Sequence, residues 1–274
     1  MIRKINDTTF SCTCPFCNKD AFKFQENGIW MFLCHNCQRY MTWEKTGIKD
    51  EITTTNITNY NSIINLCQRI DTLPSNHRFR VYAENRRIPI NRVYYTDKFD
   101  QISEYAETPV KDKERLVLPF YNSNNELFGI QGRSLDKGQI RYITLMFNKD
   151  ELKLFGQEHC DTSKQFYIVE GPIDSLFVKN CIAMAGSDAA LNKYKTNSVI
   201  CLDNEPRNKQ IVQKMAKFLD DGFKIVIWPD SVKEKDINEF IVNGHTKAEL
   251  QSIIENNIYS GLTGKIKLNS WKKV

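Results

Sequence analysis

The sequence predicts an α/β protein built from three modules, and three observations support this prediction. Four cysteines stand in two close pairs near the N-terminus. An arginine-rich stretch follows and leads into two apolar segments that are joined by a run of asparagines. After Cys160, short apolar runs alternate with helical segments, which is the pattern of a mainly parallel sheet flanked by helices.

Length and composition fit a globular chain. The 274 residues allow either one large domain or about two compact domains with a small module, at roughly 100 to 200 residues per domain. Hydrophobic residues make up 41% and charged residues 26%, which are ordinary values for globular proteins. No apolar run approaches the roughly 18 residues of a membrane helix, and MIRKINDTTF lacks the apolar stretch of a signal peptide. We therefore expect a cytoplasmic protein with no membrane partner.

The first predicted module, residues 1–45, is organised around two C-x2-C pairs, Cys14 with Cys17 and Cys34 with Cys37. One such pair grips a metal ion from a tight turn, and a second pair completes a tetrahedron around zinc. Nine cysteines, an odd number in a chain without a secretion signal, favour metal binding over disulfides. We predict a zinc ribbon that holds one structural Zn2+, with a hairpin that turns near Gly28.

Some neighbouring side chains of this module have two interpretations. Cys12 and His35 are alternative ligands, although the pair Cys14 and Cys17 matches the second knuckle better and His35 is expected on the surface. Aromatic and basic side chains suit either single-stranded nucleic acid or a small core; they are Lys19, Phe22, Lys23, Phe24, Trp30, Arg39, Tyr40 and Trp43. For Phe22, Phe24 and Phe32 we expect the core.

Residues 46–62 read as a linker, and residues 63–160 as a basic α+β subdomain. TGIKDEITTTNITNYNS is polar and has no periodicity. The next module begins with RFRVYAENRRIPINRVYY, in which five arginines accompany one glutamate, and continues with a hairpin signal in ERLVLPFYNSNNELFGIQGRSL. A net charge of +5 alone says little about partners, but clustered arginines suit phosphate. We expect these arginines to form a surface that binds phosphates or the backbone of a nucleic acid. The alternative is a solvated helix face.

The last module, residues 161–245, places acidic residues at the ends of predicted strands. Glu170 follows FYIV, Asp203 and Glu205 follow SVICL, Asp230 follows FKIVIWP, and Asp236 comes soon afterwards. Because the carboxyl ends of parallel strands share one edge, these acids should converge. Clustered carboxylates repel one another unless a divalent cation lies among them, and Mg2+ prefers such oxygen ligands. We therefore predict bound Mg2+ or Mn2+ at this edge.

The remaining features of the last module are expected to be structural. Four further acids are interpreted as helix caps or surface residues: Asp174, Asp188, Asp220 and Asp221. Gly171 leaves space beside the Glu170 carboxylate, and Pro172 suits the first turn of the following helix. Residues 246–274 are expected to form a short C-terminal tail.

The ribbon, the basic middle and the strand acids occur in an order that resembles the DnaG-type DNA primases of bacteria and their phage relatives. EGPID resembles the glutamate motif of the Toprim domain, and Asp203-Asn204-Glu205 stands where the family usually has Asp-x-Asp. WPDSVKEKDINEF resembles the late acidic motif. The chain departs from the family at Glu205, which replaces an aspartate, and at Asn238, where another late aspartate often occurs. The resemblance extends to about residue 245, and no separate helicase-interaction domain is evident.

The resemblance implies a phage-type primase that makes short RNA primers on single-stranded DNA for replication, by two-metal nucleotidyl transfer. It implies Glu170, Asp203 and Glu205 as catalytic residues, Glu170 acting as ligand or general base, with Asp230 and Asp236 as further metal ligands. The residues expected to bind template or ribonucleoside triphosphates are Arg86, Arg87, Arg115, Arg133, Arg141 and Lys149. A replicative helicase is the expected partner, in a bacterial host cytoplasm if the chain is phage-encoded. The alternatives are a Toprim nuclease and a non-catalytic DNA-binding or helicase-loading protein.

Overall fold

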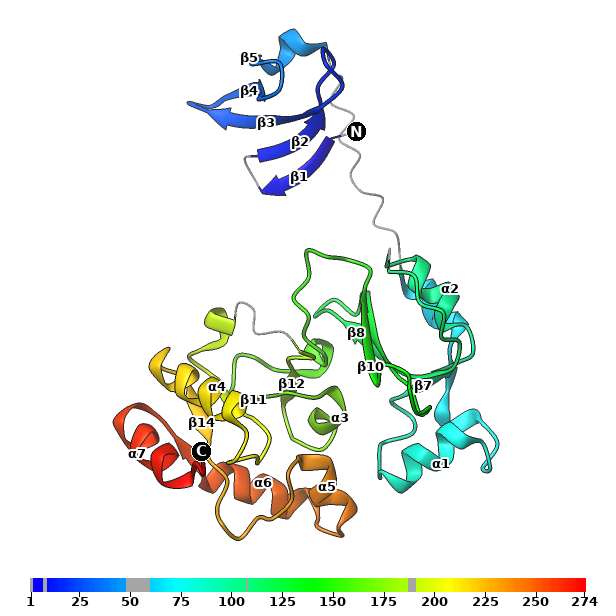
Figure 1. The fold of residues 1–274 in the computed structure, drawn as a ribbon, viewed down its shortest axis with the longest axis vertical. Helices are drawn as coiled ribbons and strands as arrows, with labels where there is room; N and C mark the ends of the chain where they lie inside the picture. The colour runs from blue at the N-terminus through cyan, green and yellow to red at the C-terminus, as the bar shows by residue number, and fades with distance from the viewer. Residues whose placement is uncertain (1, 7–8, 48–59, 107, 187–190) are drawn as a thin grey trace. The chain divides into compact units, whose positions relative to one another are not determined.

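The computed structural model describes residues 2–6, 9–47, 60–106, 108–186 and 191–274 (Figure 1). The chain divides into two compact units, Met1–Thr58 and Asn59–Val274, here called the N-terminal and C-terminal units. The predicted linker, residues 46–62, falls largely outside the described residues, as does Asp188. The predicted boundary between residues 160 and 161 lies inside the C-terminal unit.

The N-terminal unit is a five-stranded antiparallel sheet with strands in sequence order. Its strands are β1 (Ile2–Asn6), β2 (Thr9–Thr13), β3 (Asp20–Glu26), β4 (Ile29–Cys34) and β5 (Arg39–Thr42), followed by the 3-10 helix η1 (Trp43–Thr46). The expected hairpin joins β3 to β4 through Asn27 and Gly28, whose φ values of 50° and 80° fit the tight turns favoured between antiparallel strands. The pairing of β3 with β4 therefore begins next to this turn, at Glu26 and Ile29.

One face of this sheet packs into the core of the N-terminal unit, and the side chains of the other face are more exposed. Phe32 is fully buried with Ala21 and Trp43, as expected. Phe22 and Phe24 are only partly buried, because alternate residues of a strand point to opposite faces and both lie on the face away from Phe32. The expectation that these two phenylalanines belong to the core was wrong.

Lys23 takes the core position that lies between Phe22 and Phe24 in β3. It is only 5% exposed, and its Nζ lies 4.5 Å from the ring centroid of Trp43 and 4.9 Å from that of Trp30. A lysine is tolerated there because the aromatic faces attract its positive charge. Lys23 and Trp43 are therefore too deeply buried to contact nucleic acid directly.

The C-terminal unit begins with an antiparallel sheet, the middle sheet, in the order β10-β9-β8-β7-β6. Its strands are β6 (Gln68–Arg69), β7 (Tyr94–Thr96), β8 (Arg115–Tyr121), β9 (Leu127–Arg133) and β10 (Tyr142–Met146). The predicted hairpin is β8–β9, and β10 continues the meander. The helical elements are α1 (Arg78–Asn85), α2 (Phe99–Glu104) and the 3-10 helices η2 (Tyr60–Leu66), η3 (Ile70–Thr72) and η4 (Gln157–His159).

The second sheet of this unit, the last sheet, has the order β12-β11-β13-β14-β15. Its strands are β11 (Phe166–Val169), β12 (Cys181–Ala183), β13 (Ser198–Cys201), β14 (Lys224–Val226) and β15 (Ile258–Tyr259). The first four are parallel, as predicted, and β15 joins the β14 edge in the antiparallel direction. The accompanying helices are η5 (Leu191–Tyr194), α3 (Pro172–Ser175), α4 (Lys209–Asp220), α5 (Ile237–Val242), α6 (Lys247–Asn256) and α7 (Gly261–Trp271).

Helices cover both faces of the last sheet (Figure 1). Phe166 and Ile168 of β11 pack with residues of α4 and α7 on one face. Tyr167 and Val169 point the other way, into a core that includes residues of α3, α5 and α6 and also of β8 in the middle sheet. This shared core explains why the chain does not separate into two units near residue 160.

Residues 246–274 differ from the expected tail because they are built into the last sheet. Helix α6 begins at a complete capping box formed by Thr246 and Glu249. Leu250 is fully buried, and Leu268 and Trp271 of α7 join the core beside α4. These apolar positions hold the segment in place. No helix in the described ranges is long and apolar enough to cross a membrane.

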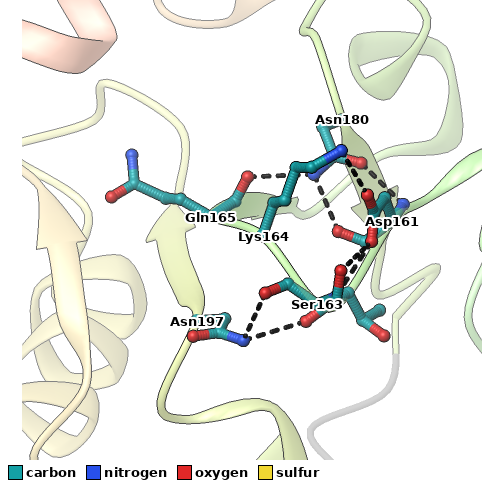
Figure 2. A network of polar contacts seen from close by, with 7 residues as sticks. Asp161, Ser163, Lys164, Gln165, Asn180 and Asn197 are labelled. Carbon is teal, nitrogen blue, oxygen red and sulfur yellow. Dashed lines mark hydrogen bonds and ion pairs between the residues drawn. The ribbon is translucent and has the colours of Figure 1, made fainter.

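Side-chain amides secure the chain where it enters β11 (Figure 2). Asn180 donates to the carbonyl oxygens of Asp161 and Gln165, at 3.0 and 2.9 Å. Asn197 donates to the carbonyl oxygens of Thr162 and Ser163. The amino end of β11 is thereby tied to the segments that enter its two neighbouring strands, which sets where its carboxyl end and Glu170 lie.

Candidate active site

The structure brings Cys14, Cys17, Cys34 and Cys37 together in the N-terminal unit. Their Sγ atoms all lie within 4.8 Å of one another, with 3.7 Å between Cys14 and Cys37 and 3.6 Å between Cys17 and Cys34. Four sulfurs at about 2.3 Å from a tetrahedral zinc ion would be about 3.8 Å apart, so the group has the size that zinc requires. The two alternative ligands are outside the group: Cys12 is buried nearby and His35 is exposed.

The carboxyl edge of the last sheet carries a group of acidic residues. Glu170 directly follows β11, and Asp203 comes two residues after β13. Five carboxylates are here called the acidic cluster, because the charges of four of them act on the fifth, Asp203; the four are Glu170, Asp174, Glu205 and Asp236. Parallel pairing of β11 with β13 places Glu170 and Asp203 near each other, because both strands end at the same edge of the sheet.

Asp203 shows how closely these charges are packed. Burial raises the pKa of its carboxyl to about 8, and the negative charges of Asp174, Glu170, Asp236 and Glu205 all act in the same direction. Both effects disfavour the ionised form. A cation placed among the carboxylates would reverse them, so the cluster has the chemistry of a divalent-metal site.

Asp174 belongs to this cluster, which corrects its interpretation as a helix cap or surface residue. Burial raises the pKa of its carboxyl to about 7, with Asp236 the next cause. A Cβ added to Gly171 would lie 2.6 Å from Asp174 Oδ2, so the space that the glycine leaves serves Asp174 rather than Glu170. The sequence contains a signal for this placement, since Asp174 follows Glu170 by four residues, about one helical turn.

Asn204 draws the late acidic segment toward Asp203. Its side-chain amide donates to the carbonyl oxygens of Val232 and Glu234, and its backbone N–H donates to that of Lys235, at 2.7 Å. The next residue, Asp236, caps α5 by accepting from the backbone N–H of Glu239. A helix N-cap is a fixed position, so Asp236 is held at the cluster by backbone geometry.

The other two predicted acids of the sheet edge lie differently. Glu205 accepts a hydrogen bond from Asn208 at 3.0 Å, and its charge is the smallest of the four that act on Asp203. Asp230 is exposed in the turn after β14, and Lys233 donates to its backbone carbonyl. Its role as a metal ligand stays a prediction.

Arginines of the middle sheet and of α1 adjoin the acidic cluster. Burial raises the pKa of Tyr82, and the charges of Arg133, Arg86 and Arg141 lower it. Burial also raises the pKa of Tyr142, on which Arg133 and Asp174 act with opposite signs. We call Arg86, Arg133 and Arg141 the arginine group. Charges of the arginine group and of the acidic cluster thus act on the same side chains, Tyr142 and Asp174.

Two members of the arginine group carry donors without a protein acceptor. The Nε atoms of Arg86 and Arg133 are buried and have no hydrogen-bond partner among the described residues. Buried donors are nearly always paired, so such atoms next to a cluster of carboxylates are suited to an acceptor oxygen on a ligand. Arg133 is further held between the rings of Tyr82 and Tyr142, at 4.9 and 4.8 Å.

Arg115 has a structural position, which contradicts the prediction that it binds template or nucleotide. It is fully buried, and its guanidinium donates to Asp112 and to the carbonyl oxygens of Gly132 and Ile140. A Cβ on Gly132 would lie 2.3 Å from the ring of Phe99 and 2.7 Å from Arg115 Cδ, so the glycine makes room for both side chains. The remaining predicted basic residues, Arg87 and Lys149, are exposed.

Asn238 stands where the resemblance to the DnaG-type primases led us to expect an aspartate that could bind a metal ion. It is 1% exposed, and its backbone N–H donates to Asp174 Oδ1 at 2.9 Å. Its side-chain amide donates to the carbonyl oxygen of Arg86 at 2.8 Å. An aspartate could not supply that second donor, so asparagine serves as a link between the acidic cluster and the end of α1.

Comparisons of sequence identify primase relatives. The DNA primase of Enterobacteria phage T4 is 33% identical over 220 residues, which cover 76% of this chain and 64% of that protein. The chain therefore spans just under two thirds of the length of this relative. An uncharacterised protein of Mycoplasma pneumoniae, an MG010 homologue, is 28% identical over 148 residues, 48% of this chain and 69% of that protein. No family model matches the chain.

Comparisons of structure identify the same group. The zinc-binding and RNA polymerase domains of Aquifex aeolicus primase give a TM-score of 0.53 at 16% identity, over 93% of this chain and 80% of theirs. The RNA polymerase domain of Mycobacterium tuberculosis primase DnaG gives 0.57 at 14% identity, over 72% and 81%. A DnaG primase catalytic domain bound to ssDNA gives 0.54 at 15%, over 72% and 76%. The chain is therefore similar in sequence to the phage T4 DNA primase and similar in fold to the DnaG-type primases of bacteria.

Proposed function

We propose that this chain is a DNA primase that synthesises short RNA primers on a single-stranded DNA template for replication. The observation that carries the proposal is the meeting of the acidic cluster with the arginine group inside one compact unit. Nucleotidyl transfer needs both kinds of group, carboxylates for divalent cations and fixed positive charge for phosphates. The sequence similarity to the phage T4 DNA primase supports the same conclusion.

The acidic cluster would hold Mg2+ or Mn2+ through Glu170, Asp203, Glu205 and Asp236, with Asp174 added and Asp230 as a further candidate. Bound divalent ions would activate the 3′-hydroxyl for attack on an α-phosphate and stabilise the pyrophosphate that leaves. Glu170 either holds an ion or accepts the proton of that hydroxyl. Asp203 and Asp174 would give up their protons as the ions bind, because the positive charge would offset the burial and the repulsion that raise both pKa values.

The basic residues would bind the phosphates of template and incoming ribonucleoside triphosphates. The buried Nε atoms of Arg86 and Arg133 are the best-placed donors, since they have no acceptor among the described residues. Arg141, Arg87 and Lys149 are exposed and would contact the backbone of the DNA or of the growing primer. Guanidinium groups suit this task because they donate bidentately and keep their charge.

The N-terminal unit would be held by one structural zinc ion on its four cysteines and would contact the template. Its open sheet face presents Phe22, Phe24 and Tyr40, with His35 in edge contact with Phe22 at 5.9 Å between ring centroids. Exposed aromatic rings on a sheet are suited to stacking with unpaired bases. The ssDNA bound to a DnaG catalytic domain of similar fold supports single-stranded DNA as the template, and a replicative helicase remains the proposed partner.

A primer-synthesis assay tests this proposal. The zinc-loaded full-length chain is incubated with single-stranded DNA of mixed sequence, labelled ribonucleoside triphosphates and Mg2+ or Mn2+, with and without a replicative helicase. Short RNA products that require the divalent cation and disappear in Glu170→Gln are the expected result. Asp221→Asn, which removes an exposed carboxylate at the far end of α4, is the matched control and should keep full activity.

Other products would assign a different function. DNA cleavage without RNA synthesis would identify a nuclease that uses the same acidic cluster. Binding of single-stranded DNA with neither product, under every cation and helicase condition, would identify a DNA-binding or helicase-loading protein. Primer synthesis that survives Glu170→Gln unchanged would remove the acidic cluster from the mechanism.

A further inference from the structure

Lys214 reaches into the acidic cluster from α4. Its Nζ lies 3.2 Å from Glu170 Oε1, across 44 residues of sequence. The helix begins directly after the Glu205 loop, at the N-cap Asn208, so Lys214 stands in its second turn beside the carboxyl end of β11. The ammonium group is therefore anchored to the same framework as the carboxylates.

The surroundings of this ion pair are strongly negative. Glu170 acts on Asp203 together with three further carboxylates, namely Asp174, Asp236 and Glu205. Another lysine, Lys235, lies 3.7 Å from Asp236 with its side chain 61% exposed, whereas the Lys214 side chain is 37% exposed. Lys214 is thus the more enclosed of these two ammonium groups, and its partner is the acid that directly follows β11.

We propose that Lys214 is a displaceable counter-cation, which neutralises Glu170 while the acidic cluster holds no divalent ion and leaves when that ion binds. The inference deepens the proposed function and rests on its divalent-cation site. A divalent ion bound at Glu170 would repel the ammonium group of Lys214, because the two cations would compete for the same carboxylate at short distance. The affinity of the site for the divalent ion would therefore include the cost of breaking this ion pair.

The properties of the lysine side chain suit displacement. Lysine is a point charge on a flexible four-carbon stem, so the ammonium can swing away without moving the helix. At 37% exposure it can become hydrated again as it leaves Glu170. The benefit is that five clustered carboxylates never stand without a cation, which protects the metal-free fold from their mutual repulsion.

Two other roles for Lys214 predict different changes in the affinity for the divalent ion when the lysine is removed. If Lys214 orients Glu170 as a permanent support, its removal should weaken binding of the divalent ion. If the pair is an incidental surface contact, its removal should change nothing, as for many exposed ion pairs. A competing counter-cation requires the opposite outcome, tighter binding, so the sign of one affinity change separates the three roles.

The test measures Mn2+ binding to the zinc-loaded full chain by the electron paramagnetic resonance signal of free Mn2+. Zinc on the four cysteines keeps Mn2+ from that site. We expect Lys214→Met to bind Mn2+ about fivefold more tightly at low salt, with a smaller gain at high salt. Lys214→Arg keeps the charge and should bind at or below the wild-type affinity. Lys217→Met, which removes an exposed charge from the same helix, is the matched control and should leave the affinity unchanged.

A second readout covers the metal-free state. Without divalent ions, the melting temperature of Lys214→Met should be lower than that of the wild type. Saturating Mn2+ should remove this difference. Lys214→Gln should give the same two results. Equal or weaker Mn2+ binding in both variants would overturn the inference while leaving the metal site intact. Wild-type protein that binds no Mn2+, or binds it equally well in Glu170→Gln, would instead overturn the metal site of the proposed function.

Discussion

Asn238 donates its side-chain amide to the carbonyl oxygen of Arg86, 2.8 Å away, and so joins the first turn of α5 to the end of α1 across 152 residues of sequence. The same residue donates its backbone N–H to Asp174. Residue 238 thus connects Asp174 of the acidic cluster with Arg86 of the arginine group. A change there should affect both sides of the proposed site.

Replacing Asn238 by aspartate should destabilise the C-terminal unit. The substitution removes the donor to Arg86 and places a second buried carboxylate beside Asp174, with the residue only 1% exposed. Leaving a buried acceptor unpaired and burying a charge together cost about 2 to 4 kcal/mol. Chemical denaturation at neutral pH measures this loss. Asn124→Asp in the exposed β8–β9 turn is the control and should stay within about 0.5 kcal/mol of wild type.

The stability of the metal-free chain should fall as the pH rises from about 4 to about 8. The pKa values of Asp174 and Asp203 in the folded chain are about 7 and about 8, above the ordinary aspartate value of 3.8. The folded state therefore binds more protons than the unfolded state in this interval, so each unit of rising pH lowers the free energy of unfolding. Denaturant titrations at pH 5.5 and pH 8 with a chelator present give the slope.

Neutral replacements identify the groups that cause this slope. Asp203→Asn should raise the free energy of unfolding at pH 8 by roughly 1 kcal/mol or more, and by less near pH 5, because the cost of keeping the folded carboxyl protonated grows as the pH rises above the unfolded pKa. Saturating Mn2+ should flatten the wild-type slope. A wild-type stability that rises with pH over the same interval would show that the acidic cluster is not a set of repelling carboxylates.

Zinc should be required for the N-terminal unit to fold. Removing one ligand, as in Cys34→Ser, opens the tetrahedral group and should abolish stoichiometric zinc binding, because a sheet of this size depends on the metal for much of its stability. Zinc content by atomic absorption and the near-UV circular dichroism of the tryptophans measure both effects. Cys12→Ser should keep one zinc ion per chain; its loss would place Cys12 among the ligands.

Arg115 and Arg141 should differ in what their loss changes. Arg115→Met leaves Asp112 and two carbonyl oxygens without their buried donor, so it should cost about 3 kcal/mol or more of stability. Arg141→Ala should leave stability nearly unchanged but weaken single-stranded DNA binding and reduce its salt slope by about one. Thermal melts and fluorescence-anisotropy titrations at several salt concentrations separate the two effects. Equal behaviour of the two variants would contradict the structural role of Arg115.

The outline of the fold was predictable because it depends on local patterns. Two C-x2-C pairs indicate one metal group whatever the surrounding structure, and the tight turn at Gly28 is where the hairpin forms. Apolar runs alternating with helices indicate a parallel sheet, and the parallel pairing of β11 with β13 brings Glu170 and Asp203 to one edge. These features follow from residue spacing along the chain.

The remaining features were decided by packing between distant segments. Arg115 and Arg133 look alike in the sequence, yet one is buried against Gly132 and the other faces the acidic cluster. Asp174 resembles a helix cap until the fold buries it beside Asp236. Spacing along the chain thus determined which kinds of group the protein contains and which strand ends carry them. Only the tertiary structure decided their environments, because burial and the charges of neighbours depend on contacts between residues far apart in sequence.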